Sequence, residues 1–576
     1  MTFSHENQRI CQDNAMIIGL DVGGTHTDVV LLGKNGIDRA VKVPTDESDL
    51  FNTVLTGIEK ITEDIDSSII KRLVLSTTLI TNTVVQNKLP EAGMIVSSGP
   101  GIDPEYYRTN RFYYPVSGSI DHRGREIEPI DRNEIEKIAW DLKKEGIRYV
   151  GVVGKFAVRN PSHEQNIARI LGNFFDKIFA GHRISGSLNF PRRIATTYIN
   201  AAAYPIHKSF FDAVNKSLQK KGLNVPIDIL KADGGTMSLD SSSDFPGQAI
   251  FSGPAASAMG AMPFAPDNED CIVLDIGGTT TDIAVLINHV PVLNPVGISI
   301  GDYKTLIRSL ETHSIAVGGD SAITFDNHNK LKIGPQRMGP AMVYGGPVPT
   351  ITDALVVLGK IKDCDKDKSF KGLESIALSL GIPTEEAASN VFDIACKAIL
   401  SEVKEMISRI NSKPVYTIHE VMEGYKLSPK KILLIGGPAP YFARRIEELS
   451  GCRVGVVPRW NVANAIGAAI ARTTCEVALI ADTELGFALS AQEGFREKIA
   501  ADFSMTDAVK TSFRLLTEKA MKRGAGESDL EMEVIESLQF NMVKGFYTSG
   551  RNIRVRAQIK PGLVQGYDSI ADTLTV

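Results

Sequence analysis

Leu20–Leu32 has the sequence LDVGGTHTDVVLL, and Leu274–Leu286 has the sequence LDIGGTTTDIAVL. The shared pattern is Asp-(Val/Ile)-Gly-Gly-Thr-(His/Thr)-Thr-Asp. A turn alone requires only one or two fixed residues, so turn chemistry does not account for a repeat of this length. The repeat indicates that one structural unit occurs twice in the chain.

Apolar residues flank both copies of the motif. MIIGL (Met16–Leu20) precedes the first copy and DVVLL (Asp28–Leu32) ends it, and the same order recurs at Cys271–Ile287. Each copy is predicted to form a β-hairpin with the glycines at its tip. Glycine there permits a positive φ and a close approach of a ligand to the backbone.

Each predicted hairpin places a strand-borne aspartate beside backbone N–H groups and threonine hydroxyls. Such a loop can hold phosphate oxygens, while the aspartate holds Mg²⁺ through water. Two of them could clamp a nucleoside triphosphate from opposite sides, with Asp21 and Asp275 as the magnesium residues. The predicted phosphate-binding residues are Gly23, Gly24, Thr25, Thr27, Gly277, Gly278, Thr279 and Thr280. Thr27 and Asp28, like Thr281 and Asp282, finish the hairpins, and hydrogen bonding within the loop is as good an explanation for them as ligand contact.

Helical and strand patterns alternate between the two motifs. Glu134–Lys144 places Ile135, Ile138 and Leu142 on one helical face, and the strand-like Arg148–Val153 follows. This alternation predicts an α/β fold. We expect a flexible tail at residues 1–15, a first lobe at 16–190, a second lobe at 191–475 and a C-terminal domain at 476–576. The last domain is expected to contain short strands with glycine turns.

Length and composition restrict the class of protein. The 576 residues exceed what one hydrophobic core supports, and the net charge of −5 with scattered basic residues argues against nucleic acid as a partner. The 6 cysteines form no C-x-x-C pair, so zinc sites and a disulfide framework are not expected. No apolar run is long enough to cross a membrane, and the polar N-terminus does not look like a secretory signal. These observations favour a cytoplasmic location.

The doubled motif resembles that of the actin, hexokinase and heat-shock-type ATPase superfamily. Three further stretches fit: THSIAVGGD (Thr312–Asp320) is similar to a phosphate-contacting loop, ILLIGGPAP (Ile432–Pro440) to the adenosine motif, and ANAIGAAIA (Ala463–Ala471) to a helix near the hinge between lobes. The resemblance implies two duplicated, ribonuclease H-like lobes around a nucleotide cleft, with ATP and Mg²⁺ bound there. It adds Gly318, Gly319, Asp320, Gly436 and Gly437 to the nucleotide-binding candidates.

Within that superfamily the chain resembles the hydantoinase/oxoprolinase family. The stretches that carry this resemblance are STTLITNTVVQNK (Ser76–Lys88), DHRGREIEPID (Asp121–Asp131), NPSHE (Asn160–Glu164), SGPAASAMGA (Ser252–Ala261) and Lys332–Ile361. The family implies an ATP-dependent phosphorylation of the carbonyl oxygen of an amide, lactam, hydantoin or ketone, followed by hydrolysis or carboxylation. It also implies a second subunit similar to hydantoinase B, which we expect to be a separate polypeptide. Whether the chain forms a homo-oligomer is left open.

Polar residues in the family-like stretches are candidates for catalysis and substrate binding. His313 and Thr279 join Asp21 and Asp275 as catalytic candidates, and the substrate candidates are Thr77, Thr78, Asn82 and Asp353. Each has a purely structural alternative: Asn82 could order its helix, His313 could be a satisfied core histidine, and Asp353 could cap the helix that follows it.

Two alternatives to a carbonyl-activating enzyme remain open. The same two-lobed hinge could serve a nucleotide-gated, chaperone-like or reactivating ATPase, or a kinase that releases a stable phosphate ester. The loop Ala316–Ser321 also departs from the Gly-Ala-Gly-Gly-Gly-Ser run common in the family, because it carries the carboxylate of Asp320. This departure suggests a substrate other than hydantoin or oxoproline.

Overall fold

The first lobe is built on a six-stranded sheet in the order β12-β11-β4-β1-β2-β3. The computed structural model describes residues 15–46, 48–86, 88–294, 296–326, 328, 330–362, 364–412, 425–567 and 570–574, so the predicted tail lies outside the described residues except for Ala15. The strands are β1 (Met16–Val22), β2 (His26–Gly33), β3 (Gly36–Pro44), β4 (Ile70–Thr77), β11 (Ile227–Leu230) and β12 (Thr236–Ser238). β1 pairs antiparallel with β2 and parallel with β4, which confirms the first predicted hairpin.

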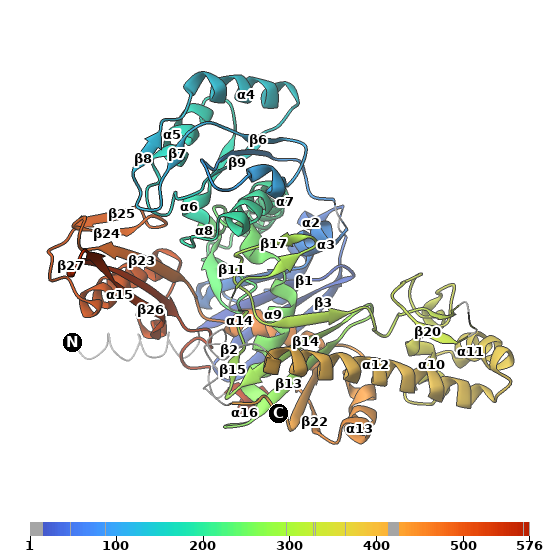
Figure 1. Ribbon diagram of the computed structural model, residues 1–576. Coiled ribbons are helices and arrows are strands. Elements are labelled where there is room, and N and C mark those ends of the chain that lie inside the picture. The colour runs from blue at the N-terminus through green and yellow to red at the C-terminus, as the bar shows by residue number, and fades with distance from the viewer. Residues whose placement is uncertain are drawn as a thin grey trace, which may run out of the picture.

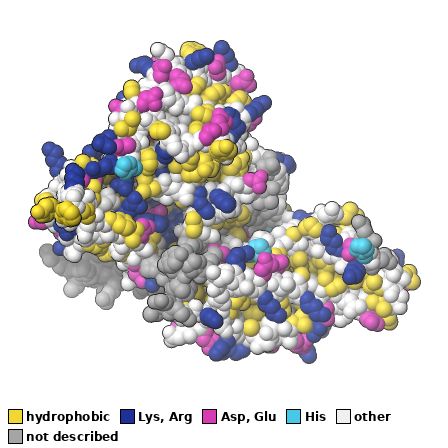
Figure 2. Space-filling view, viewed as in Figure 1, with side chains coloured by type: hydrophobic (Ala, Val, Ile, Leu, Met, Phe, Trp, Pro, Cys, Tyr) yellow, Lys and Arg dark blue, Asp and Glu magenta, His cyan; other side chains and the backbone are white. Residues whose placement is uncertain are grey.

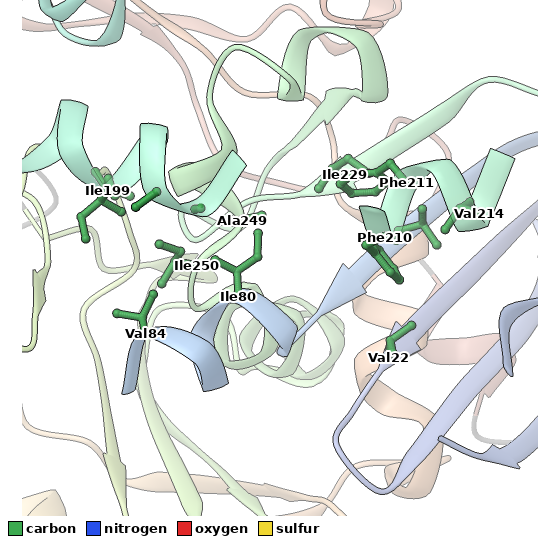
Figure 3. Close-up of a cluster of buried hydrophobic side chains, with 14 of the residues drawn as sticks. Val22, Ile80, Val84, Ile199, Phe210, Phe211, Val214, Ile229, Ala249 and Ile250 are labelled. Atoms are coloured by element: carbon green, nitrogen blue, oxygen red, sulfur yellow. The ribbon is translucent and has the colours of Figure 1, made fainter. Parts of the chain in front are cut away.

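Helices α2 (Leu50–Ile61) and α7 (Phe190–Lys221) cover the outer face of this sheet, and the short α3 (Leu79–Val85) follows β4. Figure 3 shows Phe210, Phe211 and Val214 of α7 turned toward strand residues such as Ile229. The same close-up shows Ile80 and Val84 of α3 beside Ile250. These contacts hold α3, and with it the end of β4, in the core of the first lobe.

A parallel four-stranded sheet is inserted into the first lobe and lies at the top of Figure 1. Its strands are β5 (Gly93–Ser97), β6 (Tyr113–Pro115), β9 (Tyr149–Gly154) and β10 (Lys177–Ala180), and its helices are α4 (Arg132–Lys144), α5 (Ser162–Leu171) and α6 (Gly181–Ile184). Ile135, Ile138 and Leu142 of α4 are buried, as the helical pattern predicted. The short strands β7 (Ser119–Ile120) and β8 (Glu126–Glu128) pair beside it.

The second lobe repeats the arrangement of the first around β13 (Asp270–Ile276) and β14 (Thr281–Ile287). The sheet order is β15-β14-β13-β21-β22, with β18 also paired to β14. The other strands are β15 (Val290–Pro291), β18 (Thr312–Ile315), β21 (Lys431–Ile435) and β22 (Arg453–Val456), and the lobe carries α10 (Ile351–Val357), α11 (Lys366–Leu380), α12 (Thr384–Ser412) and α13 (Ala439–Ser450). β13 and β21 run parallel, so the second hairpin and the end of β21 meet at one sheet edge.

Two short pairs complete the second lobe, β16 (Ser299–Ile300) with β17 (Tyr303–Lys304) and β19 (Ile323–Phe325) with β20 (Leu331–Ile333). Figure 1 shows β20, α10 and α11 extending away from the rest of the molecule at the right.

Helices α9 (Ser252–Ala261) and α14 (Ala463–Ile470) form the layer between the two main sheets. Their packing requires glycine: a Cβ on Gly467 would lie 2.1 Å from the carbonyl oxygen of Ala256, and one on Gly260 would lie 2.2 Å from that of Ala463. Gly19 of β1 similarly faces the carbonyl oxygen of Ala465, at 2.1 Å from a Cβ in that position. The predicted small-residue helix therefore does lie between the lobes.

The C-terminal domain is a five-stranded antiparallel sheet, β25-β24-β23-β27-β26, covered by one helix. Its elements are β23 (Glu476–Asp482), β24 (Phe487–Ser490), β25 (Phe495–Lys498), α15 (Met505–Lys522), β26 (Met532–Lys544) and β27 (Tyr547–Ile559). The expected short strands near the end are in fact a hairpin of two 13-residue strands. Figure 2 shows hydrophobic side chains gathered at that end of the molecule, and the hairpin exposes Phe540, Val543, Phe546 and Tyr547.

After this domain the chain returns to the central layer, where Leu563, Tyr567 and α16 (Ile570–Leu574) pack. The sheet pairing also places β11 and β12 in the first sheet, although both follow residue 190. We therefore propose that the first lobe extends past residue 190 to about β12. No helix among the described residues has the length and hydropathy to cross a membrane.

Candidate functional site

The two predicted hairpins present their aspartates to one shared site. The side chain of Asn464, in the first turn of α14, donates a hydrogen bond to Asp275 Oδ2 at 3.1 Å, and Asp21 lies close enough to Asp275 for the two charges to interact. Asp275 further accepts from the Ser257 hydroxyl of α9 at 2.6 Å. Helices α9 and α14 therefore both hold Asp275 of the second lobe, and the charge of Asp275 acts on Asp21 of the first lobe.

Two further aspartates complete the cluster through strand register. Asp28 lies opposite Asp21 in the β1/β2 pair, and Asp282 lies opposite Asp275 in the β13/β14 pair. Lys42 of β3 forms an ion pair with Asp28 at 2.7 Å. Four carboxylates with one nearby ammonium make this a strongly acidic site.

Burial and mutual repulsion raise the pKa of these aspartates. Burial, with the charges of Asp28 and Asp275, raises the pKa of Asp21 to about 6. Burial and the charge of Asp275 raise the pKa of Asp282 to about 7. Burial likewise raises the pKa of Asp275. Among the described residues none of these three carboxylates forms an ion pair, as expected where a cation is bound during function.

The residues present fit a magnesium ion held with phosphate and water. Asp21 Oδ1 is buried and has no hydrogen-bond partner. Carboxylate oxygens are the ligands that Mg²⁺ favours, and this ion normally keeps several waters. Within the described ranges no three His, Cys, Asp or Glu side chains form an ion site by themselves, so water and phosphate oxygens would complete the coordination.

The tips of the hairpins expose four of the eight predicted phosphate-binding residues, and the predicted Thr27 is buried away from them. Each turn is closed by a backbone hydrogen bond, Gly23 N–H to the His26 carbonyl at 3.1 Å and Gly277 N–H to the Thr280 carbonyl at 2.9 Å. Gly24, Thr25, Gly278 and Thr279 are exposed. Thr27 and Thr281 are instead buried: Thr27 Oγ1 lies 2.9 Å from Thr45 Oγ1, and Thr281 Oγ1 donates to the Val317 carbonyl.

The loop that contains Gly318 and Gly319 rests on the second hairpin. Gly319 N–H donates to the Gly277 carbonyl at 3.0 Å, and Asp320 N–H donates to the Gly278 carbonyl at 2.6 Å. A Cβ on Gly318 would lie 2.7 Å from the Gly277 oxygen. The predicted third phosphate loop is therefore in direct contact with the second.

Gly436 and Gly437 follow β21 at the same sheet edge. Gly436 has φ +91°, and a Cβ there would lie 2.6 Å from Asp275 Oδ1, whereas one on Gly437 would meet no atom within 4 Å. The carboxyl ends of parallel strands are the usual ligand edge of such sheets. Gly436 thus borders the aspartate cluster, and Gly437 leaves open space beside it.

His313 is not brought to the aspartates. In the β14/β18 pair Ser314 lies opposite Asp282 and His313 lies opposite the buried Ile283. Successive side chains on a strand point to opposite faces, so His313 lies on the other face of the sheet. There its Nε2 lies 3.1 Å from Glu402 Oε2 on α12.

Asp353 is also fully engaged within the second lobe. It lies in the first turn of α10 and forms a capping box with Thr350. Its carboxylate accepts from the backbone N–H groups of Met342, Val343 and Thr350 and from the hydroxyl of Ser369. The capping alternative describes this geometry better than a substrate contact.

Thr77 and Thr78 lie beside the first hairpin, while Asn82 lies one turn further along α3. Thr78 N–H donates to the carbonyl of Val22, at the end of β1, and Thr77 exchanges hydrogen bonds with Ser252 at the start of α9. Both threonines therefore lie next to the first phosphate loop, where Thr77 is buried and Thr78 is half-buried. Asn82 N–H donates to the Thr78 carbonyl within the helix.

Asn464, Ser257 and Lys42 are site residues that sequence reasoning missed. Asn464 is the one polar side chain in Ala463–Ile470, so its position in an otherwise small and apolar helix was a usable signal. Lys42 and Ser257 carry no comparable signal, because only strand and helix packing brings them to the aspartates.

A separate groove of about 730 Å³ lies on the outer face of the first lobe. It is lined by the start of α2, by Arg148 and Tyr149, and by α7 residues such as Lys208 and Asp212. None of the predicted site residues lines it, so it is distinct from the aspartate cluster.

Comparison with known proteins identifies the family. The model of the hydantoinase/oxoprolinase N-terminal region matches residues 17–175, and the hydantoinase/oxoprolinase model matches residues 193–477. Caprolactamase subunit alpha of Pseudomonas jessenii is 23% identical over 77% of this chain and 68% of its own length. The 5-oxoprolinase of Saccharomyces cerevisiae is 24% identical over 77% of this chain but only 40% of its own length.

A solved structure supports the fold. A nucleotide-free structure of acetone carboxylase, described as an ATP-dependent enzyme, superposes with a TM-score of 0.70 at 17% identity and covers 96% of this chain and 88% of its own. This likeness shows that the α/β arrangement of two lobes and a C-terminal domain is shared.

Proposed function

Because this chain belongs to the hydantoinase/oxoprolinase family, we propose that it binds ATP between its lobes and phosphorylates the carbonyl oxygen of an amide, lactam or ketone. The observation that carries the proposal is that Asp21 and Asp275 lie close enough for their charges to interact, with Asp275 held by Asn464 and Ser257 of the central helices. It gives the two duplicated hairpins one common site, which a triphosphate and its metal require.

ATP supplies the phosphoryl group, and Mg²⁺ neutralises the phosphate charge. A lone pair on the substrate carbonyl oxygen forms the new bond to the terminal phosphorus, the bond to the bridging oxygen breaks, and ADP leaves with that electron pair. The carbonyl oxygen thereby becomes part of a good leaving group, which makes the carbon open to hydrolysis or carboxylation.

The residues of this chain bind and orient the reactants. The exposed backbone of Gly24, Thr25, Gly278 and Thr279 offers N–H groups to phosphate oxygens, and Asp21 and Asp275 hold the metal through water. Phosphoryl transfer depends mainly on such positioning and charge neutralisation. Thr78, which is half-buried beside the first hairpin, is the nearer of the two threonine candidates to the space proposed for the carbonyl substrate, because Thr77 is buried.

A second polypeptide completes the proposed reaction. Caprolactamase, one of the relatives, is named as a subunit of a larger enzyme, and the 5-oxoprolinase extends well beyond the region that matches this chain. We therefore propose a hydantoinase B-like partner that carries out the step after phosphorylation.

Nucleotide binding can be tested with the chain's own fluorescence. The chain has 2 tryptophans, and the carbonyl of Trp460 accepts from the N–H of Gly436, beside the proposed adenosine site. In a Trp140→Phe background, Mg²⁺ and ATP should change the Trp460 emission, and ADP release should be measurable.

Asp275→Asn should abolish ADP release while the thermal unfolding transition stays cooperative. ADP release that persists in both Asp21→Asn and Asp275→Asn would reject the assignment of these residues.

The substrate class requires a second assay. A panel of lactams, hydantoins and ketones should raise the rate of ADP release, with and without the candidate partner. A chain that hydrolyses ATP at one rate in the presence of every carbonyl compound and partner would instead favour the nucleotide-gated ATPase.

A further inference from the structure

A carboxylate lies directly on the second phosphate loop. Asp320 N–H donates to the Gly278 carbonyl at 2.6 Å, and a Cβ placed on Gly278 would lie 2.9 Å from Asp320 Oδ2. The exposed backbone of Gly278 is the part of the hairpin proposed to accept phosphate. An uncompensated Asp320 would therefore repel the ligand that this loop is proposed to bind.

Arg337 provides the missing positive charge. Its Nη2 donates to Asp320 Oδ2 at 3.1 Å. The side chain of Arg337 is 36% exposed and that of Asp320 is 20% exposed, so the pair lies at the rim of the site rather than in the core. Arginine has five N–H donors, and the contact with Asp320 uses one of them.

The backbone around Arg337 is fixed relative to Asp320. The carbonyl of the preceding residue, Gln336, accepts from Ala322 N–H at 3.1 Å, and Gly334 N–H donates to the Ala322 carbonyl at 3.0 Å. Ala322 is two residues from Asp320 in the same loop. The loop that starts at Gly334 is thus hydrogen-bonded to the loop that carries the carboxylate.

From these contacts we infer that Arg337 is a positioning residue for the terminal phosphates of ATP, which acts by neutralising Asp320 at the second phosphate loop. The inference rests on the proposed function, because it assumes that a triphosphate binds at this loop. It assigns a role to a residue outside the repeated motif. It also explains how a loop with an acidic residue in place of a small one can still receive phosphate.

The test is a pair of variants and their combination, with affinities for ATP and AMP measured on the full-length chain by calorimetry in the presence of Mg²⁺. Arg337→Gln should weaken ATP binding by about tenfold or more, and more strongly at low salt, because an exposed negative charge then faces the triphosphate. The affinity of the same variant for AMP, which lacks the terminal phosphates, should fall by less than about threefold. The double variant Asp320→Asn/Arg337→Gln should regain most of the lost ATP affinity, because the repelling charge is gone.

Arg444→Gln is the matched control, since Arg444 is 86% exposed and pairs with Glu448 on α13 of the same lobe. Its ATP affinity should equal that of the unmodified chain. Equal losses for ATP and AMP in Arg337→Gln, unchanged ATP binding, or failure of the double variant to recover would each overturn the role of Arg337. If the unmodified chain itself binds no ATP, the proposed function fails, whereas the other results leave it standing.

Discussion

At the scale of single residues, the site holds charge that the folded chain does not compensate. Asp21 is buried, one of its carboxylate oxygens lacks a partner, and two other aspartates raise its pKa. Buried groups of this kind reduce stability unless a ligand completes them. We therefore expect the aspartates to serve ligand binding and to reduce the stability of the protein when no nucleotide is bound.

Asp21→Asn should accordingly stabilise the chain in the absence of nucleotide. The pKa of Asp21 is raised from 3.8 to about 6, so the folded state holds a proton more tightly than the unfolded state, and stability from this group falls as pH rises from 3.8 to 6. At pH 7.5 the variant should gain about 1–3 kcal/mol in free energy of unfolding. Urea denaturation across this range should show the gain shrinking as pH drops below 6 and vanishing below 4.

Added Mg²⁺ and ATP should reverse the order of stability. The ligand stabilises whatever state binds it, so the melting temperature of the unmodified chain should rise while that of Asp21→Asn stays constant. A variant that is less stable at pH 7.5 without nucleotide would contradict the uncompensated charge at Asp21.

At the scale of elements, the hairpins could be predicted from sequence because glycine turns and apolar strands are local signals. The role of His313 could not be predicted, because a register in which Ser314 rather than His313 lies opposite Asp282 decides which side chain faces the site. The membership of β11 in the first sheet depends on pairing with β4 across a long insertion. The pairing of Arg337 with Asp320 likewise arises only when two loops meet.

The contact between α9 and α14 leads to a prediction about Gly467. Its Cβ would lie 2.1 Å from the Ala256 oxygen and 2.4 Å from the Gly260 nitrogen, so Gly467→Ala must push the helices apart. We expect a loss of about 1–3 kcal/mol in free energy of unfolding, although alanine favours helix more than glycine does. Because α14 carries Asn464, the affinity for ATP should fall as well.

Gly172→Ala is the matched control, because a Cβ there would have only ordinary contacts at 3.5 Å or more and the residue already has a helical φ of −58°. Its denaturation midpoint should stay at or slightly above that of the unmodified chain. Equal stability of the two variants would show that the helices have room to separate.

At the scale of the whole molecule, the C-terminal domain is joined to the lobes by a network of charges. Glu476 at the start of β23 contacts Arg556 of its own sheet at 3.0 Å and lies 3.8 Å from Arg308 of the second lobe. Lys231, which directly follows β11 of the first sheet, donates a hydrogen bond from its Nζ to the carbonyl of Thr474, two residues before Glu476. The network therefore lies where all three parts of the chain meet, and its charge state should affect how they hold together.

Glu476→Gln tests that dependence. Burial raises the pKa of Glu476, but Arg556, Arg308 and Lys519 outweigh it and lower the pKa to about 2. The stability from this carboxylate is therefore complete above pH 4.5 and is lost as pH falls toward 2. The side chain is 32% exposed, which weakens the interaction by screening. We therefore expect the variant to lose about 1–2 kcal/mol in free energy of unfolding at pH 7.

Urea denaturation at pH 7 and pH 3 should show that the difference in stability narrows in acid. The control Glu497→Gln, with a 59% exposed side chain in the same domain, should match the unmodified chain at both pH values. A loss of stability in Glu476→Gln that is as large at pH 3 as at pH 7 would mean that packing, rather than charge, holds the C-terminal domain to the lobes.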